Sequence, residues 1–178
     1  MKEIIRKEML LKRKSLSFRE VEAFGEMVYE NLLKIEEFVS AKSCFCYCDF
    51  KNEVPTAKIR EYFKDKILYE PVVEGDVMHA VIRKGNINIF NGYGIEEPKE
   101  FEITQKPADI SIIPLVACDR YGNRIGFGKG YYDGYLKDKK TLKIGLCYSW
   151  QIVDFVQKTA GDVRLDYIVC EQEIIKVD

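Results

Sequence analysis

The sequence lacks a membrane-length hydrophobic run and any sizeable net charge. No apolar stretch approaches the roughly 18 residues of a transmembrane helix, and residues 1–14 are too charged for a signal peptide. With 28 basic and 29 acidic side chains, the net charge is −1, so the protein has no general attraction for nucleic acid. We therefore expect a cytoplasmic protein that binds neither membranes nor nucleic acid.

Cysteine and histidine are also too few for a disulfide framework or an obvious metal centre. The chain has six cysteines, three of which alternate at Cys44, Cys46 and Cys48. Alternate residues of a strand lie about 6.6 Å apart, so these thiolates could hardly converge on one zinc ion, whose bonds to sulfur are about 2.3 Å long. We expect them to be small apolar groups on one face of a strand. The single histidine, His79, fits no catalytic pattern and is interpreted as structural, although histidine's ability to exchange protons near neutral pH keeps another role open.

The hydrophobic pattern indicates one α/β domain covering residues 1–178. A helix is predicted at 2–14, and a second begins with a capping box from Ser17 to Glu20 and carries one apolar stripe to about Glu36. Extended and helical patterns then alternate, which is typical of a mainly parallel central sheet with helices on both faces, a three-layer α/β/α arrangement. The predicted strands are 43–49, 66–73, 77–83, 109–117, 142–149 and 166–170, and the further predicted helices are 56–64, 131–137 and 151–157.

A glycine-rich loop follows the most apolar of these strands. The run 109–117 is nearly continuous in apolar residues, as in a central strand covered on both faces. Four glycines then occur between Gly122 and Gly130, and such a loop can turn successive N–H groups toward an anion. Arg124 and Lys129 add positive charge, and open α/β sheets bind ligands at the carboxyl ends of their strands. The loop is predicted to bind an oligophosphate, with a flexible surface loop as the alternative.

This loop does not match the common nucleotide-binding motifs. Five residues separate Gly122 from Gly128, whereas a Walker A loop has four before its Gly-Lys pair and then Ser or Thr, where Gly130 stands here. The Rossmann fingerprint fails as well, since the glycines fall at 126, 128 and 130.

The segment Arg124–Asp133 (RIGFGKGYYD) and the preceding IIPLVACDRYGN resemble the signature of the 5-formyltetrahydrofolate cyclo-ligase family, also called 5,10-methenyltetrahydrofolate synthetase. Weaker similarity covers most of the chain, including 2–6, 53–56, 94–98, 144–151 and 162–171. The resemblance implies a ligase that uses ATP and Mg²⁺ to convert 5-formyltetrahydrofolate into 5,10-methenyltetrahydrofolate. ADP and phosphate would be released by way of a phosphorylated iminium intermediate, without a protein nucleophile.

The resemblance also implies the roles of individual residues. Lys129 and Arg124 would be catalytic, and Asp133 and Asp162 would hold Mg²⁺. ATP would be bound by Lys2, Arg6, Arg124, Gly126, Gly128, Lys129, Gly130, Tyr131 and Tyr132. The folate would contact Glu53, Phe127, Gly128, Lys129, Gly130 and Tyr131. Two positions depart from the family pattern: Gly161 stands where many members have histidine, and Gly134 where bacterial members often have a basic residue.

The residues alone leave other interpretations open. Lys2 and Arg6 lie one helical turn apart and could grip one polyphosphate, or form an ordinary solvated face. Glu53 could simply be a carboxylate that the dipole of a helix N-terminus favours.

The chain could also have a different function. It could be a nucleotide- or folate-binding module without turnover, or an enzyme that acts on a phosphosugar or acyl-CoA. Retention of Lys129 and Asp133 argues against the first of these functions. We expect a monomer.

Overall fold

A computed structural model describes the whole chain, residues 1–178. Its helices are α1 (Lys2–Lys14), α2 (Phe18–Leu32), α3 (Glu36–Ser40), α4 (Ala57–Tyr62), α5 (Tyr131–Leu136) and the 3₁₀ turn η1 (Ser149–Gln151). Its strands are β1 (Ser43–Cys46), β2 (Ile67–Glu74), β3 (Val77–Arg83), β4 (Asn88–Phe90), β5 (Glu96–Pro98), β6 (Phe101–Thr104), β7 (Ile110–Pro114), β8 (Ala117–Asp119), β9 (Arg124–Ile125), β10 (Leu142–Leu146), β11 (Ile152–Val153), β12 (Tyr167–Val169) and β13 (Ile174–Lys176). None of the helices combines the length and apolar character needed to cross a bilayer.

The main sheet has eight strands in the order β13-β12-β10-β7-β1-β2-β3-β6. The strands from β12 to β2 in this order are parallel, and β13, β3 and β6 join antiparallel at the edges. Strand β7 lies between β10 and β1, and every one of its residues is buried. The prediction of a central strand in 109–117 is therefore confirmed, although the run divides at Pro114 into β7 and β8.

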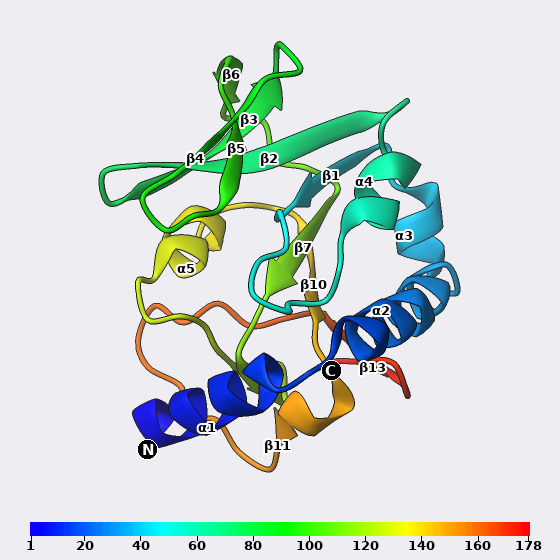
Figure 1. Cartoon of the computed structure of the whole chain (residues 1–178), viewed down its shortest axis with the longest axis vertical. Helices are drawn as coiled ribbons and strands as arrows, with labels where there is room; N and C mark the ends of the chain where they lie inside the picture. The colour runs from blue at the N-terminus through cyan, green and yellow to red at the C-terminus, as the bar shows by residue number, and fades with distance from the viewer.

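Alternating side chains of the sheet form cores on its two faces. On one face, α2, α3 and α4 cover β1, β7, β10 and β12, and Phe38 and Phe63 are fully enclosed there. On the other face, Phe45 of β1 stacks on Tyr135 of α5, with ring centroids 4.5 Å apart. Figure 1 shows α2, α3 and α4 on the opposite side of the sheet from α5. The α/β/α arrangement is confirmed, with one layer reduced to a single short helix.

The helix predicted at 151–157 does not form. The buried side chain of Gln151 accepts a hydrogen bond from the Tyr148 N–H and donates to the carbonyls of Leu115 and Val116. These contacts fix the chain in η1 and then in β11, which pairs with β8. Tertiary hydrogen bonding thus overrides the local helical preference.

Other element boundaries also differ from the prediction. The capping box of α2 is present, but α2 ends at Leu32, and Ile35, the last residue of the apolar stripe, is the N-cap of α3. Cys44 and Cys46 are buried in β1, whereas Cys48 lies beyond the strand and is half-buried. The stretch 85–98, which lies outside all the predicted helices and strands, contains the β4–β5 hairpin.

A tight turn between β8 and β9 leads into the glycine loop. The buried Asp119 carboxylate accepts hydrogen bonds from the backbone N–H groups of Tyr121, Asn123 and Val156. Gly122 has φ of +82°, and a Cβ at this position would lie 2.7 Å from the carbonyl oxygen of Leu165. Glycine is therefore required both for the backbone conformation and for space.

Gly122→Ala should lower the free energy of unfolding by about 1–3 kcal/mol, because positive φ and a backbone contact both oppose a methyl group. Gly92→Ala is the matched control, since a Cβ there meets nothing within 4 Å. Denaturant unfolding of both variants measures the difference. Equal stabilities would contradict the role given to this turn.

Candidate active site

A cavity of about 980 Å³ opens at the carboxyl end of the parallel strands, where Tyr47 follows β1 and Pro114 ends β7. Its wall comes from α1, the segment after β1, the β2–β3 pair, the hairpin segment 91–97, the glycine loop and the start of α5. All the predicted site residues line it: Lys2, Arg6, Glu53, Arg124, Gly126, Phe127, Gly128, Lys129, Gly130, Tyr131, Tyr132, Asp133 and Asp162. The volume suits a cavity that holds sizeable organic ligands.

Helix α1 docks directly on the glycine loop. The Arg6 Nε donates to the carbonyl oxygen of Gly126 over 2.8 Å, and the Arg6 side chain also pairs with Glu3. Gly128 has φ of +99°, and a Cβ there would lie 3.6 Å from the guanidinium carbon of Arg6. Lys2 bonds the Asp162 carboxylate over 2.7 Å. The two cations of α1 therefore lie at the cavity and are not a solvated helix face.

An ion pair between a buried arginine and a half-buried aspartate fixes both ends of the loop. The Arg124 Nη1 lies 2.9 Å from the Asp133 Oδ1 and donates to the Val163 carbonyl over 2.7 Å. The same Asp133 oxygen accepts the Val163 N–H over 2.9 Å. The loop between Arg124 and Asp133 is thus tied at its base, while Lys129 in its middle is exposed. The charge of Arg124 is compensated, and that of Lys129 faces the cavity mouth.

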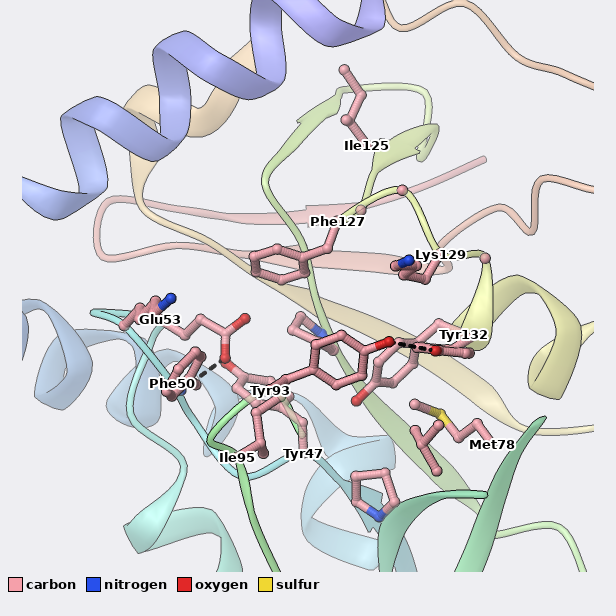
Figure 2. Close-up of a pocket in the computed structure, with 18 of the residues that line it drawn as sticks. Tyr47, Phe50, Glu53, Met78, Tyr93, Ile95, Ile125, Phe127, Lys129 and Tyr132 are labelled. Carbon is pink, nitrogen blue, oxygen red and sulfur yellow. Dashed lines mark hydrogen bonds between the residues drawn. The ribbon is translucent and has the colours of Figure 1, made fainter. Parts of the chain in front are cut away.

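A carboxylate and aromatic rings line another part of the cavity. Glu53 is 7% exposed, and its Oε2 accepts the Phe50 N–H over 2.9 Å. Burial raises the pKa of Glu53 to about 7, against the opposing effect of the Arg13 charge. Figure 2 shows Glu53, Phe127 and Tyr93 turned toward the same space. In this view the Phe127 ring lies between Glu53 and Lys129.

The β4–β5 hairpin meets the glycine loop through two tyrosines. The hydroxyl groups of Tyr93 and Tyr131 lie 2.9 Å apart, and this hydrogen bond is the main cause that raises the pKa of Tyr131 to about 12. In Figure 2 the dashed line that starts at the Tyr93 hydroxyl marks this hydrogen bond. The hairpin thus forms one wall of the cavity.

The acidic residues at the loop base suit a magnesium ion that phosphate also ligates. No cluster of three or more metal-binding side chains is present. Asp133 accepts the N–H of Val163, the chain neighbour of Asp162, and both aspartates line the cavity. In each carboxylate one oxygen takes all the protein contacts. Because Mg²⁺ is usually held by one or two carboxylates, water and substrate phosphates, this donor set fits it.

Sequence reasoning missed several residues of the cavity wall. Tyr93, Asn91 and Glu97 come from the hairpin, whose fold was not predicted. Arg13 was not among the predicted site residues, yet it lines the cavity. Its distance of seven residues from Arg6 places both on one helix face, and this signal could have found it.

Comparisons with known proteins show the family of the chain. The sequence model of the 5-formyltetrahydrofolate cyclo-ligase family matches residues 1–171. The chain belongs to this family. It is 31% identical over 172 residues to the 5-formyltetrahydrofolate cyclo-ligase of Mycoplasma genitalium, covering 95% of this chain and 97% of that protein. The corresponding Haemophilus influenzae protein is 29% identical over 173 residues, covering 90% of this chain and 92% of that protein.

Solved structures of two relatives share the fold. The NMR structure of Aquifex aeolicus 5,10-methenyltetrahydrofolate synthetase has a TM-score of 0.87 and 34% identity, covering 99% of this chain and 92% of that one. The 5,10-methenyltetrahydrofolate synthetase from Mycoplasma pneumoniae has a TM-score of 0.77 and 29% identity, covering 96% of this chain and 99% of that one. The protein is therefore an enzyme, a ligase of folate metabolism.

Glu53→Gln should stabilise the ligand-free protein at pH 8 and have little effect near pH 4. The pKa of this carboxyl is about 7 in the folded protein instead of the ordinary 4.5. As pH rises, the unfolded chain therefore loses this proton at a lower pH than the folded protein does. The stability of the wild type therefore falls as pH rises through this interval, by roughly 2–3 kcal/mol, and is level above it. The glutamine variant lacks this loss.

Thermal unfolding of the wild type and Glu53→Gln between pH 4 and pH 8 measures the gap between their free energies of unfolding. Glu22→Gln, at an exposed position, should show no such pH-dependent gap. A gap for Glu53→Gln that does not change with pH would contradict the buried-carboxyl assignment.

Proposed function

We propose that this protein uses ATP and Mg²⁺ to cyclise 5-formyltetrahydrofolate to 5,10-methenyltetrahydrofolate, with release of ADP and phosphate. The observation that carries the proposal is one continuous cavity with two chemically different parts. One part has cations and a glycine loop, and the other has a buried carboxylate and aromatic rings. A reaction between a nucleotide and a pterin requires such an arrangement.

The triphosphate is assigned to the part formed by α1 and the glycine loop. Lys2, Arg6 and Lys129 line it, and Gly126, Gly128 and Gly130 leave the loop backbone accessible to phosphate oxygens. Tyr131 and Tyr132 complete this wall. Arg124 lies at the base of this part, where its contacts to Asp133 and Val163 hold the loop in place.

The folate is assigned to the space between Glu53 and the glycine loop. A pterin has N–H donors that the Glu53 carboxylate can accept, and a flat ring system that the exposed ring of Phe127 can cover. The segment from Phe127 to Tyr131 borders both parts of the cavity. The loop therefore lies where the reacting groups of the two substrates meet.

The chemistry asks the chain chiefly to position two substrates and to neutralise charge. The formyl oxygen attacks the γ-phosphorus of ATP. The bond between this oxygen and phosphorus forms as the bond between phosphorus and the ADP oxygen breaks. The N10 nitrogen then adds to the formyl carbon and gives up its proton, and phosphate leaves with this proton and the former formyl oxygen. Lys129 and the loop N–H groups stabilise the charge that develops on the transferred group. Mg²⁺ at Asp133 and Asp162 would neutralise phosphate charge.

We further propose a cytoplasmic monomer. Every residue assigned here belongs to a single chain and lines one cavity within it. A second subunit is not needed to complete the site.

Turnover of the purified protein tests the proposed function. Mixing it with ATP, Mg²⁺ and 5-formyltetrahydrofolate should produce the absorbance of the methenyl product together with equimolar ADP. Omission of ATP should abolish the product. A correctly folded protein that binds both substrates but forms no product would favour the binding-module alternative.

Lys129→Ala should reduce kcat by about 10²-fold or more, because it removes one positioned charge from the transferred phosphoryl group. The melting temperature should barely change, since Lys129 is exposed. Lys137→Ala, at an exposed position just beyond α5, is the matched control. Steady-state rates of the three proteins decide the question, and near-normal turnover of Lys129→Ala would refute the phosphate role.

Asp133→Asn should raise the Mg²⁺ concentration required for half-maximal activity, because it removes a negative charge from the proposed metal site. Asp138→Asn, an exposed change near the same helix, should leave the requirement unaltered. Titration of Mg²⁺ at saturating substrates gives the comparison. If the wild-type and Asp133→Asn curves superimpose, Asp133 acts only through its contacts with Arg124 and Val163.

A further inference from the structure

Arg13 is a buried cation without a hydrogen-bond partner. It lies near the end of α1, is 3% exposed and lines the cavity. Its closest carboxylate oxygen, the Glu53 Oε1, is 3.9 Å from the Arg13 Nη1, which is beyond hydrogen-bond distance. Yet every fully enclosed polar side-chain atom of the protein has a hydrogen-bond partner. The Arg13 guanidinium nitrogens have none, so they are not fully enclosed. They keep contact with the cavity, where a ligand can reach them.

The surroundings of Arg13 restrict what that ligand can be. Glu53 lies beside the guanidinium and uses its Oε2 for the Phe50 N–H, so its Oε1 is also available to the cavity. The Phe127 ring covers the guanidinium, with its centroid 5.2 Å from the Arg13 Cζ. The site thus presents hydrogen-bond donors and an acceptor side by side, next to an aromatic face.

A phosphate or a carboxylate would satisfy Arg13 but would be repelled by Glu53. A flat group with an acceptor adjacent to N–H donors satisfies both side chains. The amide edge of a 2-amino-4-oxopteridine has this pattern: the 4-oxo oxygen accepts, and the N3–H and the 2-amino group donate. Its ring system can also lie against Phe127.

We propose that Arg13 is a specificity-determining residue, which donates to the 4-oxo oxygen of the pterin while Glu53 accepts from N3–H and the 2-amino group. This inference rests on the proposed function, since it takes the pterin as the ligand of this part of the cavity. Loss of an acceptor opposite a buried guanidinium is costly, because the charged donors are then left unpaired. The enzyme should therefore reject pteridines that lack the 4-oxo group.

Folic acid and aminopterin provide the test, because aminopterin carries a 4-amino group in place of the 4-oxo group. At pH 8 the wild type should bind folic acid at least about tenfold more tightly than aminopterin. Arg13→Met should lower this ratio several-fold while the affinity for ATP stays the same; the preference that remains comes from the N3–H, which Glu53 accepts and aminopterin lacks. Lys7→Met, an exposed change on the same helix, should keep the wild-type ratio. Arg13→Lys, which keeps the charge without the planar fork, should give an intermediate ratio.

Each outcome separates this inference from the proposed function. Equal binding of the two pteridines by a wild type that forms the methenyl product would overturn the inference alone. A preference for folic acid that is undiminished in Arg13→Met would do the same, as would a loss of ATP affinity in that variant. The wild-type ratio needs no variant, so the inference stays testable if Arg13→Met does not fold. A protein that binds neither pteridine and forms no product would refute the proposed function.

Discussion

The site depends on the ion pair between the buried Arg124 and the half-buried Asp133. These residues stand at the two ends of the glycine loop, and their side chains meet over 2.9 Å, with the backbone of Val163 bonded to both. The loop is therefore closed at its base and anchored to the segment that carries Asp162. Removing one partner of such a pair leaves an uncompensated buried charge, which is far more costly than the pair is stabilising. The geometry of the phosphate-binding region follows from this closure.

The ligand-free protein compensates most of the charges that we assign to substrate binding. Lys2 is paired with Asp162, Arg6 with Glu3 and Arg124 with Asp133. These carboxylates hold the cations at the cavity wall before ATP arrives, so that little reorganisation is needed when phosphate replaces a carboxylate. At the other end, Arg13 and Glu53 are close without being bonded. The pterin end therefore keeps unused hydrogen-bonding capacity.

The sequence allowed much of the fold and the site to be predicted, because the relevant signals were local. The apolar run that contains β7, the capping box of α2 and the glycines before α5 are patterns within a few residues, and the structure has each of them. The helix predicted at 151–157 failed because hydrogen bonds from Gln151 to residues 115 and 116 decide the local conformation. The hairpin wall and the role of Arg13 depend on contacts between distant segments. A periodic pattern of polar and apolar residues does not contain that information.

The central claim is that the formyl oxygen of the folate attacks the γ-phosphate of ATP within this one cavity. It is tested most directly with 5-formyltetrahydrofolate labelled with ¹⁸O in its formyl group, followed by mass analysis of the released phosphate after a single turnover. The account predicts one ¹⁸O atom in each phosphate formed with the methenyl product. Unlabelled phosphate, with the ¹⁸O found in water, would contradict it.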